Sequence, residues 1–338
     1  MEEKYISLAH GNGGRYMREL ISDLFARHLS DPERADGLDV TLDAATIALG
    51  DGEPCMTTDG FIVQPLEFPG GDIGSLAVNG TVNDLAVSGA APRYLSLNAF
   101  IEEGLEIDVL DRIVASLAKA AREAGVLVVA GDTKVVPRGE GGGLYLATAG
   151  VGERPKGVDL GMHRIQAGDR VLVSGPIGDH GICVMLARED FEIRGDVRSD
   201  CGNVIDLART AMRHDGLRFM RDPTRAGLAG VAWEISRHAG VTVRLDEAAV
   251  PVRDPVKMVC EMLGYDPYYL ACEGRCVAVV DADQANDVLS DWRALPSGEG
   301  AAIIGEIGEG EPRVVLTTEL GGERILDDLE EDPLPRIC

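Results

Sequence analysis

Residues 107–134 read IDVLDRIVASLAKAAREAGVLVVAGDTK, and the change of period within this stretch decides the fold. Apolar residues recur at helical spacing from Ile107 to Ala124, which predicts an amphipathic helix that Gly125 stops. Val126–Ala130 is a continuous apolar run, which is typical of a buried strand. A patterned helix that leads directly into a buried strand predicts a domain in which helices and strands are interleaved.

Both flanks of this stretch carry further helix and strand patterns. The expected helices are Arg15–Leu29 and Asp72–Gly89, and the expected strands are Ala44–Leu49, Met56–Val63, Tyr94–Ile101 and Leu144–Gly150. Pro155 and the glycines of Gly152–Gly157 interrupt regular pairing and indicate a linker. We therefore expect a first domain over residues 1–153.

The second half of the chain repeats the same interleaving. The expected strands are Arg170–Ser174, Leu217–Met220, Val241–Leu245 and Cys276–Val280, with two more near Ala302–Ile307 and Val314–Thr317. The expected helices are Gly181–Arg188, Val204–Arg213, Arg225–His238, Val256–Leu263 and Gln284–Leu295. Helix pairs and hairpin-like neighbours occur in both halves, so the predicted class is α+β, or mixed α/β, with a second domain over residues 154–326.

The segment 327–338, DDLEEDPLPRIC, differs from the rest in kind. It is acidic and contains two prolines, a composition that resists helix and sheet and favours an extended, mobile chain. Ten residues in a polyproline-like form reach ~30 Å. Such an arm would let the thiol of Cys338 travel, although an incidental exposed cysteine is the alternative interpretation.

Composition narrows the classes of partner and location. The chain has 57 acidic and 32 basic residues and a net charge of −25, which repels nucleic acids and anionic lipid surfaces. We therefore expect no nucleic acid partner and no membrane partner. A nucleotide such as ATP would need bound cations against this field. The start of the chain has no signal-peptide pattern and no long apolar run, so we expect a cytoplasmic protein.

The cysteine pattern indicates reduced thiols rather than a disulfide framework. The seven cysteines are an odd number and contain no CxxC pair. This pattern argues against both a disulfide scaffold and a paired zinc knuckle.

Four aspartates interrupt apolar contexts in the first half. They are Asp43, Asp59, Asp84 and Asp132. An unpaired buried carboxylate is costly, so each needs a cation, a helix N-terminus or hydrogen-bond donors. Mg²⁺ would meet this need and bridge to nucleotide phosphates. For any one aspartate, a turn or cap role is the alternative.

Glycines precede the first predicted helix. The run His10-Gly11-Asn12-Gly13-Gly14 offers backbone N–H groups to an anion, although it is not a P-loop and a plain coil is the alternative.

Three more polar residues stand at the ends of predicted elements in both halves. Asp222 opens a helix, where it either caps that helix or faces a metal. Glu273 lies between Cys272 and Gly274, and a solvated turn acid is its alternative interpretation; Cys272 and Cys276 are expected to pack in the core. Lys134 follows Asp132 just after an apolar strand, either as a surface lysine or as a cation aimed at phosphate.

The motifs together resemble one family. The ending Pro335-Arg336-Ile337-Cys338 resembles the C-terminal signature of the HypE family of hydrogenase maturation factors. Six other motifs along nearly the whole chain are similar to that family. They are His10–Gly14, Thr57–Pro65, Asn79–Leu85, Val129–Lys134, Gly178–Gly181 and Asp222–Arg225. This family belongs to the PurM-like superfamily of aminoimidazole ribonucleotide (AIR) synthetase, selenophosphate synthetase and thiamine-monophosphate kinase.

The resemblance implies a fold, ligands and a dimer. It implies two AIR synthetase-like α+β domains that hold ATP and Mg²⁺, with dimerisation through the N-terminal domain. The implied metal ligands are Asp43, Asp59, Asp84, Asp132 and Asp222. The implied nucleotide-binding residues are His10, Gly11, Gly13, Gly14, Asn83, Asp84, Thr133 and Asp222. Two departures from the family pattern are Ala226, where a glycine is common, and Ala271-Cys272, where Asn or Ser often precedes the glutamate.

The resemblance also implies an activity. In the family pattern, a carbamoyl group on Cys338 is dehydrated to a thiocyanate at the expense of ATP, which supplies cyanide ligands of [NiFe]-hydrogenase. Glu273 and Lys134 would handle the proton and the charge, and the sequence leaves open which is the base. The implied partners are a HypF-type carbamoyltransferase and a HypC–HypD complex.

Two other functions stay open at this point. One is a selenophosphate synthetase-like enzyme or small-molecule kinase of the same superfamily, which has no need of a terminal thiol. The other is a non-catalytic scaffold that docks a partner through its acidic tail.

Overall fold

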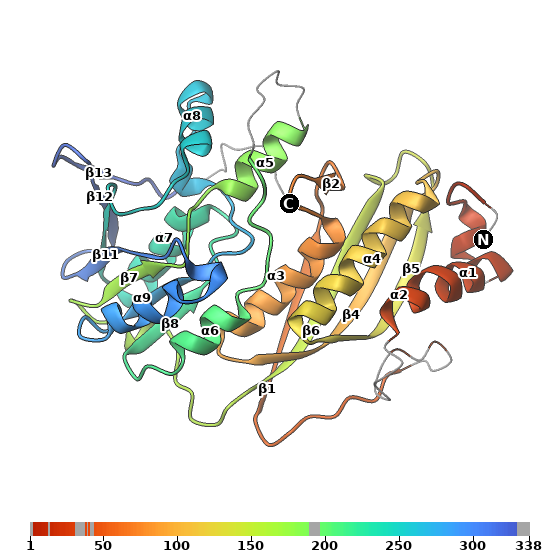
Figure 1. Cartoon of the computed structure of the whole chain (residues 1–338), viewed down its shortest axis with the longest axis horizontal. Coiled ribbons are helices and arrows are strands. Elements are labelled where there is room, and N and C mark those ends of the chain that lie inside the picture. Colours follow the sequence, from red (N-terminus) through yellow and green to blue (C-terminus); the bar gives the residue numbers. More distant parts are fainter. Residues whose placement is uncertain are drawn as a thin grey trace. The chain divides into compact units, whose positions relative to one another are not determined.

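The computed structural model describes residues 3–12, 14–30, 38, 40, 44–188 and 197–329 (Figure 1). They form two compact units. The first contains the residues up to Leu85 together with Ala90–Lys156, and the second contains Ala86–Gly89 and the residues from Gly157 onward. Each unit pairs helices with a mainly antiparallel sheet, which confirms the predicted α+β class. Among the described residues, every helix is too short or too polar to span a lipid bilayer.

The first unit is built on a sheet of order β1-β6-β4-β5. Its strands are β1 (Glu53–Phe61), β4 (Ala91–Glu102), β5 (Leu127–Val136) and β6 (Leu144–Arg154). The pair β4–β5 is parallel and is joined by a helix, whereas β6 runs antiparallel to both β1 and β4. A short hairpin, β2 (Glu67–Phe68) and β3 (Gly71–Asp72), precedes the helices.

Two helices, α3 (Ile73–Val87) and α4 (Ile107–Ala124), lie along this sheet (Figure 1). The helix predicted at 107–124 is therefore confirmed, and Gly125 ends it with a left-handed φ of 71°. Small residues allow close packing. A Cβ added at Gly74 would lie 2.4 Å from the carbonyl oxygen of Ile113, and one added at Gly150 would lie 2.7 Å from Thr81. The helices thus pack closely on each other and on β6.

The N-terminal helix docks on the edge strand β5. A short 3₁₀ turn, η1 (Leu8–Gly11), leads into α1 (Arg15–Leu20), a π-helical stretch η2 (Ile21–Ala26) and α2 (Arg27–Leu29), which confirms a helix across the predicted range. A Cβ added at Gly11 would lie 2.9 Å from Cβ of Val135, so only glycine fits there. The glycine-rich loop is therefore fixed beside the end of β5.

Three sequence predictions in this unit are wrong. The linker expected at Gly152–Gly157 begins later, because Gly152–Arg154 belong to β6 and pair with β1. Ala44–Leu49 was expected to be a strand, but it is exposed and has no strand pairing. Its apolar residues have no ladder partner; the segment is held instead by the Tyr94 hydroxyl, which donates to the carbonyl oxygen of Ala48 at 3.1 Å. The strand expected to end at Ala130 continues to Val136, because β4 pairs with it along that whole length.

The second unit contains a sheet that runs β13-β12-β9-β11-β7-β10-β8 in its described part. Its strands are β7 (Arg170–Val173), β8 (Leu217–Arg221), β9 (Thr242–Asp246), β10 (Val277–Val280), β11 (Ala302–Gly308), β12 (Arg313–Thr317) and β13 (Glu323–Ile325). Its helices are α5 (Asp179–Arg188), α6 (Ile205–Ala211), α7 (Gly227–Ala239), α8 (Asp254–Leu263) and α9 (Ala285–Arg293), with short 3₁₀ turns η3 (Met162–Arg164), η4 (Pro267–Tyr269) and η5 (Pro296–Gly298). Only β9 and β12 pair in parallel among these strands.

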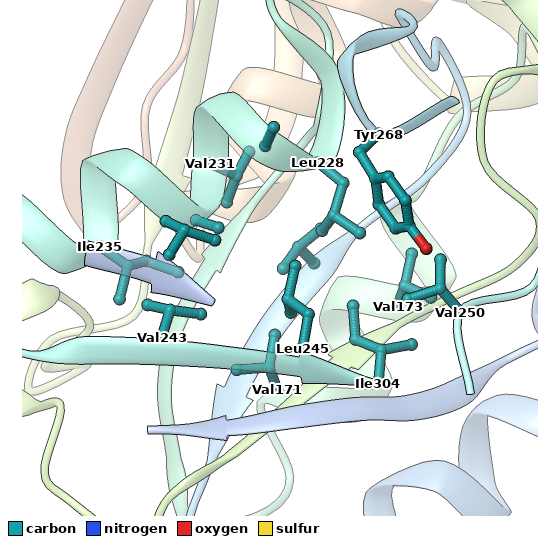
Figure 2. Packing of buried hydrophobic residues seen from close by; sticks show 14 of the residues in the cluster. Val171, Val173, Leu228, Val231, Ile235, Val243, Leu245, Val250, Tyr268 and Ile304 are labelled. Atoms are coloured by element: carbon teal, nitrogen blue, oxygen red, sulfur yellow. The ribbon is translucent and has the colours of Figure 1, made fainter. Parts of the chain in front are cut away.

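Both faces of this second sheet are covered. Figure 2 shows Leu228, Val231 and Ile235 of α7 packed over Val243 and Leu245 of β9, within a larger apolar cluster. A separate cluster on α6 and α9 includes Trp292, whose indole N–H donates to the carbonyl oxygen of Leu207 at 2.9 Å. A strand buried on both faces has no polar alternation, and β10 is accordingly buried at every position.

The last described residues are held within the second unit by hydrogen bonds and an ion pair. The indole N–H of Trp233 donates to the carbonyl oxygen of Leu326 at 2.9 Å, and the Tyr269 hydroxyl donates to that of Asp327 at 2.8 Å. Asp328 forms an ion pair with Arg237. The predicted tail at 327–338 therefore starts with anchored residues, while Cys338 lies outside the described ranges.

Candidate active site

Asp59 and Asp84 lie at one seam, between β1 and α3. Strand alternation directs Thr57 and Asp59 toward α3, and the Thr57 hydroxyl donates to Oδ2 of Asp84 at 2.8 Å. A Cβ added at Gly80 of α3 would lie 2.8 Å from the ring of Phe61 and 3.7 Å from Oδ2 of Asp59. The absence of a side chain at Gly80 thus lets the helix approach the strand, and the structure brings these two predicted ligands together.

This seam holds two carboxylates that could bind Mg²⁺ together with a phosphate. Mg²⁺ is commonly held in proteins by one or two carboxylates together with substrate phosphates and water. Asp59 and Asp84 supply that number of carboxylates, and Asn83 is buried beside Asp84 on α3. Within the described ranges, no three His, Cys, Asp or Glu side chains gather as a metal centre. Asp43, another predicted ligand, lies outside those ranges.

Asp132 and Lys134 occupy a different face of the same sheet. They alternate with Thr133 along β5, where Asp132 pairs with Asn98 and Lys134 with Phe100 on the exposed face. Thr133 is buried on the other face. Following the strand register across β4 and β6, Asp59 lies on the face of Thr133, so Asp132 does not join Asp59 and Asp84 within one chain.

The Asp132 carboxylate is held by its neighbours. It pairs with the ammonium of Lys134 and accepts a hydrogen bond of 2.8 Å from the backbone N–H of Thr133. The hydrogen bond from Lys134 is the main reason that the pKa of Asp132 is lowered from its ordinary value. The ionised carboxylate of Asp132 therefore holds the positively charged ammonium of Lys134 at this position on β5.

His10 leaves one buried donor without an acceptor. Its Nδ1 accepts a hydrogen bond of 3.1 Å from the backbone N–H of Ser7, so the proton of the neutral ring is on Nε2. Nε2 is buried and makes no hydrogen bond to the described part of the chain. Gly14 is the N-cap of α1, and its backbone N–H donates to Oδ1 of Asn12 at 3.0 Å. Gly13 is not among the described residues. A buried N–H of this kind is suited to a ligand oxygen.

Asp222 and Glu273 belong to the second unit and come from neighbouring segments. The backbone N–H of Cys272 donates to the carbonyl oxygen of Pro223 at 3.0 Å, which joins the two segments. Asp222 is buried and does not cap α7, because that helix begins at Gly227 with Ala226 as its N-cap. Helix capping, the alternative interpretation of Asp222, is thereby wrong.

The Glu273 side chain is only 4% exposed, so it is not a solvated turn acid. Cys272 and Cys276 beside it are fully buried, as expected for core residues, and burial raises the pKa of both thiols. Thiols that stay protonated are poor nucleophiles. Of Cys272, Glu273 and Cys276, the Glu273 carboxyl group is therefore the candidate for proton transfer.

Sequence reasoning missed a buried charge cluster behind this turn. Arg275 lies 3.4 Å from Oδ2 of Asp200 and 3.6 Å from Oδ2 of Asp179, which is also 3.4 Å from Arg253. Burial raises the pKa of Asp179 to about 6 and lowers that of the adjacent His180 to about 4. Asp179 and His180 stand in the Gly178–Gly181 motif and Arg275 in the Cys272–Cys276 stretch, but no sequence pattern links either segment to Asp200.

The fold and the motif positions define the class of protein. The family model "AIR synthase related protein, N-terminal domain" matches residues 42–154, and "AIR synthase related protein, C-terminal domain" matches residues 166–317. The structure is similar to one titled "Crystal Structure of Hydrogenase Maturation Protein HypE in complex with ATP", with a TM-score of 0.92 and 43% identity over 98% of this chain and 99% of that one.

Full-length relatives narrow this class to one family. "Carbamoyl dehydratase HypE" of Azotobacter vinelandii is 46% identical over 98% of this chain and 97% of its own length. The protein of the same name from Escherichia coli K12 is 42% identical over 98% and 99%. The chain belongs to the HypE family. A structure titled "Crystal structure of HypE-HypF complex" also matches, with a TM-score of 0.79 and 41% identity over 91% of this chain and 99% of that chain.

Proposed function

We propose that this chain is the carbamoyl dehydratase of hydrogenase maturation, an enzyme that converts an S-carbamoyl group on Cys338 into an S-cyanide at the expense of ATP. The product supplies the cyanide ligands of a [NiFe]-hydrogenase. The observation that carries this proposal is the identity of 46% with a HypE carbamoyl dehydratase over 98% of the chain.

The reaction explains the need for ATP. The carbamoyl oxygen of S–C(=O)–NH₂ is a poor leaving group, and transfer of the γ-phosphoryl group onto that oxygen makes it a good one. The two N–H protons are then removed and the C–O bond breaks, which leaves S–C≡N. Thiocarbamate and ATP thus become thiocyanate, ADP, phosphate and one proton, with no change of oxidation state.

Asp59 and Asp84 are suited to hold Mg²⁺ at the seam between β1 and α3. When bound, Mg²⁺ neutralises charge on the transferring phosphoryl group. Asp132, on the opposite face of the sheet, and Asp222, in the second unit, are the other members of the predicted acidic set, with Asp43 predicted from sequence alone. The nucleotide is assigned to the glycine-rich loop of His10, Gly11, Gly13 and Gly14, with Asn83, Asp84, Thr133 and Asp222. The Nε2–H of His10, which makes no hydrogen bond to the described residues, supports this assignment, since it can donate to a nucleotide oxygen.

Glu273 is assigned as the base and Lys134 as the stabilising cation. A lysine can accept a proton only as an unprotonated amine. Lys134 instead forms an ion pair with Asp132 as an ammonium. An ammonium is suited to the negative charge that develops on the carbamoyl oxygen. Glu273 offers a largely buried carboxylate, where water competes little for the proton.

The partners follow from the same reaction. A HypF-type transferase delivers the carbamoyl group, and a HypC–HypD complex receives the cyanide. We assign the chain to a homodimer formed through its first unit, where Met56 (74% exposed) and Phe100 (41% exposed) leave apolar surface on β1 and β4. A cytoplasmic location is assigned because the reaction consumes ATP and needs a reduced thiol.

The proposal is tested by intact mass. The full chain is incubated with carbamoyl phosphate, ATP and the transferase, and the tail peptide is then analysed before and after Mg·ATP is supplied. We expect a carbamoyl adduct on Cys338 that loses the mass of one water. Cys338→Ala should abolish both masses, whereas Cys55→Ala, which removes another accessible thiol, should preserve them.

Two results would contradict the proposal. If Cys338→Ala still turned over ATP on a diffusible acceptor, the chain would be a small-molecule kinase or a selenophosphate synthetase-like enzyme. If calorimetry found no Mg²⁺-dependent binding of ATP, the chain would be a scaffold rather than an enzyme.

A further inference from the structure

The turn that carries Glu273 is enclosed by residues 199–202. The backbone N–H of Glu273 donates to Oδ1 of Asp200 at 3.1 Å, and the N–H of Gly202 reaches the carbonyl oxygen of Glu273 at 3.4 Å. A Cβ added at Gly274 would lie 1.9 Å from the carbonyl oxygen of Asp200. The two segments therefore pack backbone to backbone, and the turn cannot shift without moving Asp200.

The side chain of Asp200 is itself held in place by Arg275. This side chain is fully buried, and its Oδ2 makes no hydrogen bond within the described ranges, with Arg275 at 3.4 Å as its cation. Arg275 is held in turn, because its Nε donates to the carbonyl oxygen of Pro176 at 2.8 Å and its guanidinium lies 3.6 Å from Asp179. A buried carboxylate with one cation is costly to displace, so this arrangement is a rigid support.

We propose that Asp200 is a positioning residue for the dehydration, which holds the Glu273 turn through the backbone N–H while Arg275 holds Asp200. Proton transfer requires a base within hydrogen-bond reach of the proton, and a displacement of about 1 Å costs on the order of 100-fold in rate. Asp200 does not contact substrate in this role. The inference rests on the proposed function, because it takes Glu273 as the base.

Asp169 provides a matched control for a purely structural role. It is also a buried carboxylate of the second unit, it accepts a hydrogen bond of 2.8 Å from the backbone N–H of Gln166, and it lies 3.6 Å from Arg218. Its removal costs the same kinds of contact as removal of Asp200. It has no contact with the Glu273 turn among the hydrogen bonds and ion pairs described.

The test measures single-turnover dehydration of the carbamoylated full chain at a temperature where every variant is folded. For Asp200→Ala we expect a rate constant about 100-fold lower at saturating ATP, with an unchanged half-saturating ATP concentration. Asp200→Asn should stay within about tenfold of the wild-type rate, because its amide oxygen still accepts the Glu273 N–H. Asp169→Ala should keep the wild-type rate.

A second variant covers the case in which Asp200→Ala does not fold. Gly274→Ala forces the turn away from Asp200 and should produce the same selective loss of rate. Wild-type rates in both Asp200→Ala and Gly274→Ala would overturn the inference, as would an equal loss in Asp169→Ala. Glu273→Gln separates the two proposals: a wild-type rate in that variant removes Glu273 as base, whereas a slow Glu273→Gln with a fast Asp200→Ala removes only the positioning role.

Discussion

The Thr57 hydroxyl donates a hydrogen bond of 2.8 Å to Oδ2 of Asp84 and so joins strand β1 to helix α3. This bond orients one carboxylate of the Asp59–Asp84 seam without adding charge to it. The charge of Asp84 and its orientation are therefore separable by substitution.

Asp84→Asn should weaken Mg²⁺-dependent binding of ATP at least tenfold, which corresponds to about 1.4 kcal/mol. The reason is that an amide oxygen carries no net charge for the cation. Thr57→Val keeps the carboxylate and should change the affinity much less. Calorimetry of the full chain with Mg·ATP and with ATP in EDTA measures both, and equal affinities for wild type and Asp84→Asn would remove Asp84 from the metal site.

Lys134→Ala should slow dehydration about 100-fold at saturating ATP, because the charge that stabilises the developing oxyanion is lost. Lys134→Arg keeps the charge but changes its geometry, so an intermediate rate is expected. Lys119→Ala is the control, since Lys119 is an exposed lysine of the same unit that lies 3.8 Å from Glu123. An undiminished rate in Lys134→Ala, measured from the mass of the tail peptide, would exclude Lys134 from the reaction.

Ala226→Gly should stabilise the chain. Ala226 has a φ of 53°, in the left-handed region, where a Cβ costs roughly 1–2 kcal/mol. Glycine relieves that strain but is more flexible in the unfolded chain, so a net gain of about 1 kcal/mol is expected. Urea unfolding of the variant checks this, with Ala229→Gly in the interior of α7 as a control that should lose about 1 kcal/mol. A lower midpoint for Ala226→Gly than for wild type would contradict the strain.

Asp179→Asn should change how stability depends on pH. Burial raises the pKa of this carboxyl to about 6 in the folded chain, above its ordinary value of 3.8. The folded state thus binds the proton more tightly, and the stability that this contributes is lost as pH rises through about 6. The variant does not titrate there, so relative to wild type it should gain stability from pH 5 to pH 7.

Urea midpoints at both pH values measure this difference. Asp206→Asn is the control, because Asp206 is exposed and pairs only with Arg209 among the ion pairs described, and it should not alter the slope. A wild type and an Asp179→Asn variant with parallel pH profiles would show that Asp179 stays ionised throughout this range.

The elements with one clear period were predictable from sequence. The helix Ile107–Ala124 and its glycine stop lie where the apolar spacing put them, and the fully buried strand β10 follows from its continuous apolar residues. The strand predicted at Ala44–Leu49 failed because apolar composition says nothing about whether a neighbouring strand is present. The extension of β5 through Asp132 and Lys134 was missed because polar residues on an exposed face resemble a loop.

The candidate site was predictable only where residues stand in local motifs. Asp59 and Asp84 each interrupt an apolar context and Asp222 stands at a helix-start pattern, which marks all three in the sequence. That Asp59 and Asp84 share a seam while Asp132 lies on the other face depends on strand register, which the pattern did not fix. Asp200 and Arg275 meet through tertiary packing across 75 positions of chain, and no local pattern marks Asp200 or predicts that pairing.

The anchoring of Leu326 and Asp327 by Trp233 and Tyr269 sets the length of a tether. Covalent geometry limits the 11 residues from Asp328 to Cys338 to a span of at most about 40 Å, which sets the largest separation between Asp327 and the sulfur of Cys338. A reactant that is covalently linked to its own chain in this way has an effective concentration of about a millimolar. Dilution of the protein would therefore not slow the intramolecular step, whereas loading and unloading by other proteins would remain second order.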